Sequence, residues 1–563
     1  MSYQELVDRH QNTLQAAIQA QLQRHFYAHW NEVPSGKIYG ETANAEGQKA
    51  FEQRLNSKFT DLLQHSEDHW IGEEESPYGF ALNVLYPQTS TERLIANLQS
   101  AAQQWQSLSA ETRAAILIEA LERASKHFFE IAYATMHTTG QGFVMAFQAS
   151  GPHAFDRALE AIAMGVIELS HIPSTVRWEK PMGKFQIVAN KSYYALPKGV
   201  GVVIGCSTFP VWNSTPGIFA NLITGNPVIV KPHPKAVLPI AILVASLQQT
   251  FADLQLDPHI IQLAVDSSEQ PRTMELVLHP AVALIDFTGS TTVGNKIEQA
   301  VLPYKKETFM EKSGVNAIIL DSVANLDAVL DNIAFSIALY SGQMCTAPQN
   351  IFIPDTGVAT PEGTLDFDTI AQRLIERLNA LLENPKMGPG TLGAIQSPAT
   401  LKRIEKARSL QLPILRDSHP LEMPQFPDAR TATPLLLKAP FGATDIYEHE
   451  WFGPINFLIP APSYQAAVEA VTRSAQLNGA LSSLVYTTDE SKKQEAIANI
   501  ALRGKTPLGI NFTGFIWINQ STAFTDYHGS GGNPAGNATF TDSSFISRRF
   551  NIVGVREIPG TPA

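Results

Sequence analysis

Cys345 is one of only two cysteines in the 563-residue chain, and it stands in the stretch YSGQMCTAPQNIF, between an expected helix end and an expected strand. Glu311 precedes it by 345 − 311 = 34 residues, ahead of a Ser-Gly turn, and Glu450 stands before a Phe-Gly-Pro turn. A lone cysteine is most often a small packed hydrophobe. The hypothesis that Cys345 is a nucleophile therefore needs supporting residues elsewhere in the chain, and Glu311 and Glu450 are the candidates.

Composition excludes several classes of protein. Hydrophobic residues make up 44% of the chain and charged residues 17%, which is typical of a globular protein. The net charge of −12 argues against nucleic acid as a partner, since phosphates are bound through clustered Lys and Arg. Two cysteines cannot form a disulfide framework, and no secretory signal is visible. The apolar stretches are shorter than the roughly 20 residues that a membrane helix needs. We expect a cytoplasmic protein without a membrane partner.

The hydrophobic pattern divides the chain into units. Residues 1–90 are polar and helix-favouring and predict a mostly helical N-terminal extension, and residues 91–169 carry amphipathic helical periodicity. Short apolar runs then alternate with helical segments, first within 91–310 (VGVVIGC, PVIVKP, HIIQLAV, ALIDFTG) and again within 311–519 (NAIILDS, PLLLKAP, INFLIPA, LSSLVYTT). This alternation predicts two α/β units, the first a doubly wound parallel sheet. Residues 178–196 read as a protruding hairpin, and 520–563 end in another strand.

Five motifs occur in one order along the chain. They are GNPVIVKP, FTGSTTVG, the glutamate before a glycine turn at Glu311, the Gly-Gln-x-Cys stretch at Cys345 and the Glu-x-Phe-Gly-Pro element at Glu450. Together, over roughly Ala96 to Asn519, they resemble the aldehyde dehydrogenase superfamily. A narrower resemblance is to the phenylacetate-degradation aldehyde dehydrogenases called PaaN, related to the aldehyde dehydrogenase half of PaaZ proteins. It rests on PSGKIYGETANAEG and on HGSGGNPAG, which stands where common members carry Phe-Gly-Gly.

The resemblance implies an architecture. It is an aldehyde dehydrogenase-like α/β fold with a doubly wound, Rossmann-type NAD(P)-binding domain over 91–310 and an α/β catalytic domain over 311–519. The hairpin at 178–196 and the C-terminal segment 520–563 would form a β oligomerisation arm. By the same resemblance the arm's strands pair between subunits and give a homodimer or homotetramer.

The resemblance also assigns the chemistry. Cys345 would add to an aldehyde and form a thiohemiacetal that loses hydride, and Glu311 would act as the general base that hydrolyses the resulting thioester to a free acid. The family's oxyanion-stabilising asparagine falls on Thr208 here, with Asn213 as an alternative donor. Because losing one such donor costs about 2.7 to 4 kcal/mol in a hydrolase, this departure is compatible with a slow enzyme.

The cofactor residues follow from the same motifs. Pro234 replaces a glutamate that NAD-preferring members carry, and with His233 and Lys235 beside it NADP is favoured over NAD. The other residues assigned to the dinucleotide by resemblance are Lys231 at the adenosine ribose, Gly289, Ser290 and Gly294 near the pyrophosphate, Glu450 at the nicotinamide ribose and Phe452 against the ring.

Three functional hypotheses remain at this stage. The first is oxidation of a semialdehyde of aerobic phenylacetate breakdown, with a coenzyme A-linked aldehyde as one form. The second is a weak relative that binds nucleotide or a partner protein, and the third is a dehydrogenase of free aliphatic or aromatic aldehydes. Cys206 and the GVGVVIG run are interpreted as structural. The histidines at 279, 449 and 528 lack metal-ligand spacing, so no metal is predicted.

Overall fold

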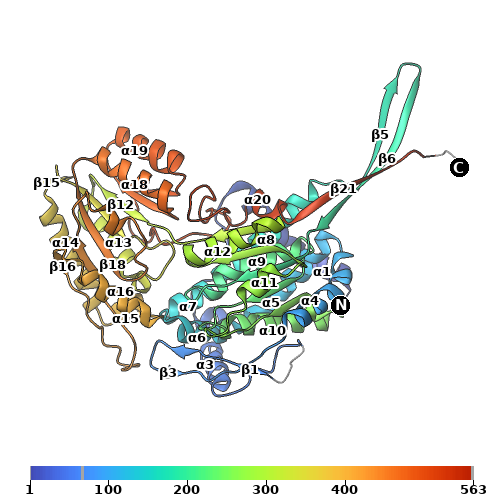
Figure 1. Cartoon of the computed structure of the whole chain (residues 1–563), viewed down its shortest axis with the longest axis horizontal. Coiled ribbons are helices and arrows are strands. Elements are labelled where there is room, and N and C mark those ends of the chain that lie inside the picture. The colour runs from blue at the N-terminus through green and yellow to red at the C-terminus, as the bar shows by residue number, and fades with distance from the viewer. Residues whose placement is uncertain (1, 65–68, 560–563) are drawn as a thin grey trace.

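The computed structural model describes residues 2–64 and 69–559, and two parallel sheets organise most of them (Figure 1). The first sheet has five strands, all parallel, in the order β11-β10-β7-β8-β9. Their bounds are β7 (Val200–Ile204), β8 (Val228–Lys231), β9 (Ile261–Leu263), β10 (Val282–Thr288) and β11 (Glu307–Glu311). The four apolar runs predicted as strands in this region are β7 to β10.

Helices cover both faces of this sheet, because the strand side chains alternate between two cores. Val203 and Val230 point into one core, which is completed by α5 (Ala110–Ala124), α8 (Pro152–Ser170), α9 (Pro210–Ile223) and α10 (Leu238–Asp253). Val202 and Ile229 point into the other, which is completed by α4 (Thr91–Gln106), α11 (Thr273–Leu278) and α12 (Thr291–Val301). The predicted doubly wound fold is confirmed.

The second sheet has seven strands in the order β16-β17-β18-β13-β12-β19-β20, parallel except for β16. It contains β12 (Ala317–Leu320), β13 (Asn350–Pro354), β16 (Ile414–Arg416), β17 (Leu435–Lys438), β18 (Ile455–Ala461), β19 (Ser483–Tyr486) and β20 (Leu508–Ile510). One face packs against α13 (Leu326–Ala338) and α14 (Phe367–Glu383), and the other against α16 (Pro398–Arg408) and α18 (Tyr464–Asn478).

The N-terminal extension is helical in its first part only. Helix α1 (Tyr3–Gln23) packs on α5 and α8, and α3 (Ala43–Arg54) packs on α6 (Phe128–Thr139). The prediction of a mostly helical extension does not hold for 70–87, which form four two-residue strands. Gly72, Pro77 and Gly79 fall in this stretch, and residues of these types interrupt a helix.

The predicted hairpin is confirmed as β5 (Thr175–Met182) and β6 (Phe185–Pro197), which project from the body (Figure 1). The C-terminal strand β21 (Phe550–Glu557) pairs antiparallel with β6 of the same chain, from Phe550 opposite Pro197 to Glu557 opposite Asn190. The resemblance predicted that the hairpin and this strand pair between subunits. For β6 and β21 this prediction is corrected, because the two strands pair within one chain.

Among the described residues, no helix has both the length and the apolar character needed to cross a membrane.

The C-terminal strand follows a buried ion pair that ties it to the first sheet. The two terminal nitrogens of the Arg549 guanidinium donate to the carboxylate of Asp286 in β10, at 2.9 and 2.6 Å, and Arg549 is fully buried. The pair holds residue 549 beside the end of β6, where the NH of Lys198 donates to the carbonyl of Arg549 at 3.2 Å, and β21 continues from there alongside its own hairpin.

We expect Arg549→Ala to lower the melting temperature of the protein. Removing one partner of a buried pair leaves the other charge uncompensated, at a cost of about 3–5 kcal/mol. Arg556→Ala, in the exposed part of β21, is the matched control. Equal melting curves for the two variants, measured by circular dichroism, would contradict the anchoring role.

Candidate active site

Cys345 lies on the loop between α13 and β13, and the backbone before it is unusual. Tyr340, Ser341 and Gly342 have φ values of 50°, 51° and 62°, all in the left-handed region. For residues other than glycine this region costs free energy and persists only when the surroundings enforce it. Here the hydroxyl of Tyr340 donates to the carbonyl of Thr139 at 2.5 Å, deep in the core.

The far side of the same loop is held by Asn316. Its side-chain nitrogen donates to the carbonyls of Cys345 at 2.8 Å and Ala347 at 3.0 Å. Its side-chain oxygen accepts from the backbone NH groups of Leu481 and Ser482 at 2.9 and 3.0 Å. One amide therefore fixes the thiol-bearing loop against the neighbouring strand end.

Glu311 is the last residue of β11, so it stands at the carboxyl edge of the first sheet, where ligands of such sheets bind. Its side chain is buried, with 5% of the residue exposed. One carboxylate oxygen, Oε2, lies 3.3 Å from Asn213 Nδ2 and 3.3 Å from His528 Nε2. The other oxygen, Oε1, has no hydrogen-bond partner within the described residues, which leaves one acceptor directed into the site.

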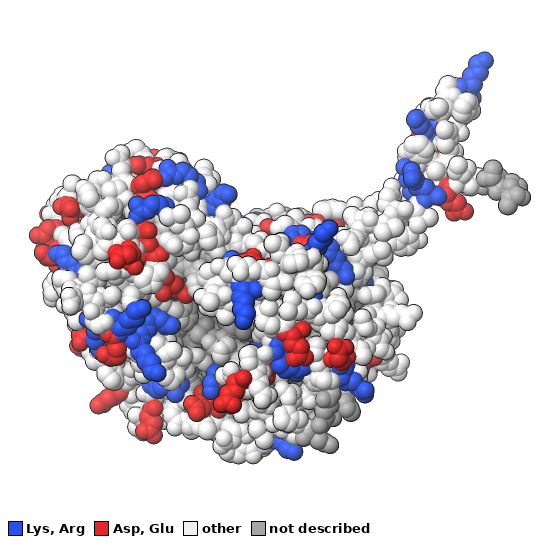
Figure 2. Space-filling view, viewed as in Figure 1, with Lys and Arg blue, Asp and Glu red and all other residues white. Residues whose placement is uncertain are grey.

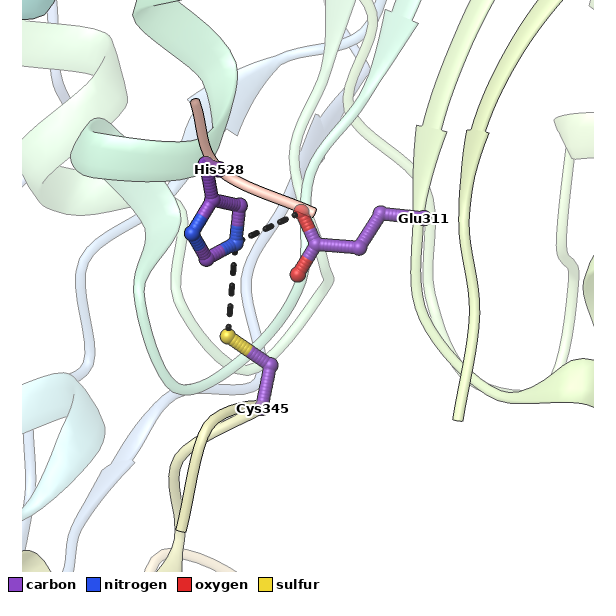
Figure 3. A group of neighbouring side chains, drawn as sticks. All are labelled: Glu311, Cys345 and His528. Carbon is purple, nitrogen blue, oxygen red and sulfur yellow. Dashed lines mark hydrogen bonds and ion pairs between the residues drawn. The ribbon is translucent and has the colours of Figure 1, made fainter. Parts of the chain in front are cut away.

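His528 completes the group, and reasoning from the sequence missed it (Figure 3). Its Nε2 lies 3.7 Å from Cys345 Sγ, and the reactive atoms of the three side chains lie within 4.8 Å of one another. His528 is 183 residues from Cys345, so spacing could not reveal the contact. The available signal was the replacement of the family's Phe-Gly-Gly by His-Gly-Ser. The absence of a metal stays a prediction.

Backbone hydrogen bonds place the His528 segment beside Glu311. The NH of Lys312 donates to the carbonyl of Ala535 at 2.6 Å, and the NH of Asn537 donates to the carbonyl of Met310 at 3.2 Å. The side-chain oxygen of Asn537 accepts from the NH of Met310 at 2.7 Å. Residues 535–537 thus run along the end of β11 and carry the preceding loop over the thiol.

Burial sets the protonation of the site. It raises the pKa of the Cys345 thiol well above its usual range, and the nearby charge of Glu311 raises that pKa further. Burial also raises the pKa of the Cys206 thiol to about 11. It raises the pKa of Glu450, against opposing hydrogen bonds from Ser313 and from the NH of Gly314. At neutral pH Cys345 therefore carries its proton and needs a base to become a nucleophile.

The two candidate oxyanion donors take different positions. The hydroxyl and the NH of Thr208 hydrogen-bond to the sulfur of Cys206, and the carbonyl of Thr208 accepts from Gln141 at 2.7 Å. Asn213, in the first turn of α9, instead reaches Glu311, and its oxygen accepts from the Cys206 thiol at 3.5 Å. The structure therefore brings Asn213 rather than Thr208 to the Glu311 carboxylate, and the oxyanion role of either residue stays a prediction.

Lys231 lies at the end of β8, and the charges around it are paired. Its ammonium is 2.8 Å from Asp266 Oδ1, and both residues are buried. Lys235 donates to the carbonyl of Glu73 at 3.1 Å and lies 3.6 Å from that residue's carboxylate. Burial, followed by the charge of Lys231, lowers the pKa of His233 to about 4, so this histidine is neutral at pH 7. The positive charge that the sequence placed around Pro234 is largely compensated.

Helix α12 presents its N-terminus at the same sheet edge, capped by Ser290, whose hydroxyl accepts from the NH of Val293 at 3.4 Å. Gly289 and Gly294 flank the cap. A Cβ added at Gly289 would lie 2.8 Å from the side chain of Phe287, and a Cβ added at Gly294 would lie 2.7 Å from the side chain of Lys312. The close packing leaves no room for a side chain at either glycine, and a helix N-terminus with its positive dipole end fits a pyrophosphate.

The Glu450 turn packs directly against the Cys345 loop. A Cβ added at Gly342 would lie 2.5 Å from the carbonyl oxygen of Gly453, so these two glycines are in close contact. Cys345, Glu450 and Phe452 line one small pocket, whereas Glu311 and His528 line a neighbouring one.

Figure 2 shows that the viewed face is hollowed between the two sheet-based units, with both acidic and basic side chains on the rim of the hollow. The predicted residues thus form two groups, a thiol–carboxylate centre and the residues at the edge of the first sheet that the resemblance assigns to the dinucleotide.

Comparisons with known proteins identify relatives. The model of the aldehyde dehydrogenase family matches residues 85–538, more than half of the chain. The crystal structure of an NAD-dependent aldehyde dehydrogenase from Burkholderia multivorans has a TM-score of 0.95 and 42% identity, covering 98% of each chain. The 4-trimethylaminobutyraldehyde dehydrogenase B of Danio rerio is 23% identical over 75% of this chain and 78% of its own. The benzaldehyde dehydrogenase of Bacillus subtilis is 24% identical over 53% of this chain, which spans 57% of that relative.

We expect Gly342→Ala to loosen the thiol-bearing loop. The new methyl group would meet the Gly453 carbonyl, and alanine at positive φ costs about 1 kcal/mol or more. The variant should melt at a lower temperature, and Cys345 should react faster with iodoacetamide because a less buried thiol has a lower pKa. Gly442→Ala, where nothing lies within 4 Å of the added carbon, is the control. The interpretation fails if both variants behave like the unchanged protein.

Proposed function

The chain belongs to the aldehyde dehydrogenase family, and from this premise we propose that it oxidises an aldehyde to a carboxylic acid at Cys345, with a nicotinamide dinucleotide as the hydride acceptor. The observation that carries the proposal is the convergence of the Cys345 thiol and the Glu311 carboxylate between the two sheets, next to the Glu450–Phe452 turn. A nucleotide-binding relative without activity would not need this convergence, so it favours the enzyme.

The residues of the chain have defined tasks in this reaction. Once deprotonated, Cys345 Sγ forms a bond to the aldehyde carbon, and the carbonyl electrons move to the oxygen, giving a tetrahedral thiohemiacetal held on the loop. The proposed donors to that oxygen are the side-chain amide of Asn213, which lies beside Glu311, and the backbone NH of Cys345. The bound dinucleotide supplies the oxidising power by accepting hydride from the carbon. Glu450 and Phe452, beside the thiol, would hold the nicotinamide end.

Hydrolysis of the resulting thioester is assigned to Glu311. Its Oε1 is buried and has no partner within the described residues, so it can accept a proton from water positioned for attack. The water oxygen bonds to the acyl carbon, the carbon–sulfur bond breaks, and the thiolate of Cys345 is regenerated with release of the acid. A free acid rather than a coenzyme A thioester is therefore the proposed product.

We expect Glu311→Gln to trap the covalent intermediate. Amide nitrogen and oxygen cannot take a proton from water, so the acyl group should stay on Cys345 while steady turnover falls by about 10²–10⁴-fold. Intact-protein mass spectrometry after mixing with aldehyde and dinucleotide reads the adduct directly. Glu307→Gln, at the other end of β11, is the control. Unimpaired turnover in Glu311→Gln would remove Glu311 as the base.

For the substrate, we propose a semialdehyde formed in aerobic phenylacetate breakdown, with a coenzyme A-linked form included. The support is the resemblance to PaaN and PaaZ proteins at the N-terminal segment and at HGSGGNPAG. Inhibition of turnover by coenzyme A thioesters supports the linked form. Turnover of free aliphatic or aromatic aldehydes without such inhibition would favour the third hypothesis instead.

For the dinucleotide, we propose that both NAD and NADP bind, with less than about tenfold discrimination. Pro234 stands where NAD-preferring members carry a glutamate, so the carboxylate that would repel a 2′-phosphate is missing at this position. This absence is the basis of the predicted NADP preference. Two ion pairs act against an NADP preference. Glu73 neutralises Lys235 and Asp266 neutralises Lys231, which reduces the attraction for a 2′-phosphate. The NADP preference itself stays a prediction.

We expect Pro234→Glu to weaken NADP binding at least tenfold, about 1.4 kcal/mol, and to leave NAD binding unchanged or tighter. A carboxylate three residues after Lys231 would repel the 2′-phosphate while still accepting hydrogen bonds from a ribose. Dissociation constants from calorimetry, without aldehyde, give the result. Pro303→Glu, on an exposed turn, is the control. Equal NADP affinity in the Pro234 and Pro303 variants would place the 2′-phosphate elsewhere.

The arm supports an oligomer as a further part of the proposal. All of β5 is exposed, as are apolar residues such as Phe185, Ile552 and Val555. Both edge strands of the arm, β5 and β21, lack a neighbour on their outer side among the described residues, and such edges favour pairing with another chain. We propose a homodimer or homotetramer, which sedimentation of the intact protein distinguishes from a monomer. A cytoplasmic location stays a prediction.

A further inference from the structure

His528 is a buried titratable group for which the proposed reaction has so far no task. Only 5% of the residue is exposed, and its Nε2 faces both Cys345 Sγ at 3.7 Å and Glu311 Oε2 at 3.3 Å. By the resemblance described above, His528 stands where common family members carry the phenylalanine of Phe-Gly-Gly, which implies that a ring of similar size is replaced here by one that can carry a proton. A nitrogen placed between a thiol and a carboxylate requires an explanation beyond packing.

Aromatic neighbours fix the orientation of the imidazole. The ring of Trp212 meets it edge-on at a centroid distance of 4.7 Å, and Phe540 stacks against it at 5.3 Å. Such contacts restrict the ring to a narrow set of rotamers. Nε2 is therefore held toward the thiol–carboxylate pair rather than being free to rotate away (Figure 3).

The N-terminal extension holds the loop that carries His528. Arg24, at the end of α1, donates to the carbonyl of Phe524 at 3.1 Å, and its guanidinium lies 3.7 Å from the ring centre of Tyr527. The NH of Phe524 donates to the buried carboxylate of Glu160 at 3.0 Å. A segment outside both sheets thus stabilises the loop next to the nucleophile.

We propose that His528 is a catalytic residue, the proton acceptor for the Cys345 thiol, and that Glu311 holds the resulting imidazolium. This inference rests on the proposed function and deepens it. It supplies the base that a buried, protonated thiol requires, and it gives the N-terminal extension a role through Arg24.

The proton transfers balance. The proton of Cys345 Sγ moves to His528 Nε2, and the sulfur keeps the electron pair that bonds to the aldehyde carbon. A bound dinucleotide would accept the hydride from the carbon, and water then attacks the thioester while Glu311 takes the proton of that water. The leaving thiolate recovers a proton from the imidazolium at His528, and the proton on Glu311 leaves with the acid product to solvent. The net reaction is aldehyde, oxidised dinucleotide and water to acid, reduced dinucleotide and a proton.

The groups around His528 are consistent with a cation there. Glu311 faces it from β11 and Cys345 from the loop before β13, while Asp526 lies two residues earlier on its own loop. From α9, Asn213 and Trp212 face the site, and the guanidinium of Arg157 in α8 lies 5.4 Å from the centre of the Trp212 ring. Arg157 is itself paired with Glu160 at 2.7 Å. Among the described residues, Glu311 is the carboxylate within 4 Å of His528 Nε2, at 3.3 Å.

The test measures the reactivity of the Cys345 thiol in the absence of aldehyde and dinucleotide, so the result does not depend on turnover. The rate of Cys345 alkylation by iodoacetamide is followed from pH 5 to 10 by peptide mass spectrometry. The variants are His528→Phe, which restores the family's ring, and His528→Gln, which keeps a polar group but cannot titrate there. His153→Gln, an exposed histidine on α8, is the matched control, and melting temperatures report folding.

We expect the unchanged protein and the control to react at least tenfold faster at pH 7 than either His528 variant. We also expect their rates to begin rising at a lower pH than the rates of the two variants. With aldehyde and dinucleotide, the alkaline shift should reappear in kcat/KM. Should His528→Gln keep the original pH profile, His528 would be a hydrogen-bonding group and the inference would be wrong. A folded His528→Phe with an unchanged profile would also overturn it.

The two proposals fail separately. If the alkylation profile depends on His528 but no aldehyde is oxidised, the proton acceptor is supported and the proposed function fails. If aldehyde is oxidised with the same kcat/KM and alkylation profile in the His528 variants, the proposed function stands and the inference fails. Should His528→Phe not fold, the comparison of His528→Gln with the control decides.

Discussion

The hydrogen bonds between the end of β11 and residues 535–537 are the interaction on which the site depends. They hold the backbone on both sides of Glu311, at Met310 and Lys312, and they carry the preceding loop so that His528 lies over the thiol. Cys345 comes from a different sheet, on a loop held by Asn316. Three segments far apart in sequence thus meet at one sheet edge, which is where parallel sheets place their ligands.

Burial determines how this site works. A thiol removed from water favours its neutral form, since an isolated charge is costly in a medium of low polarity, and the pKa of Cys345 is raised accordingly. The same burial strengthens any charge pair formed during the reaction. Imidazole, carboxylate and thiol are therefore more effective as a group than singly. The lysines at the carboxyl edge of the first sheet are paired with carboxylates, Lys231 with Asp266 and Lys235 with Glu73, so this edge carries local ion pairs rather than a broad positive field.

Local patterns were sufficient for much of the fold and for part of the site. Continuous apolar runs predicted β7 to β10, and the motifs located Cys345, Glu311 and Glu450. Long-range contacts were beyond such patterns. His528 meets Cys345 across 183 residues, Lys235 is neutralised by Glu73 from the extension, and Arg549 directs β21 to its own hairpin. Each depends on tertiary packing, which single-sequence periodicity does not encode.

Partial alkylation of the protein shows whether turnover passes through the Cys345 thiol. Samples treated with iodoacetamide for increasing times are assayed for dinucleotide reduction, and the modified fractions of Cys345 and Cys206 are measured by peptide mass spectrometry. We expect activity to fall linearly with Cys345 modification and to reach zero when that modification is complete. Activity that survives complete modification of Cys345, or that follows Cys206 instead, would contradict this expectation.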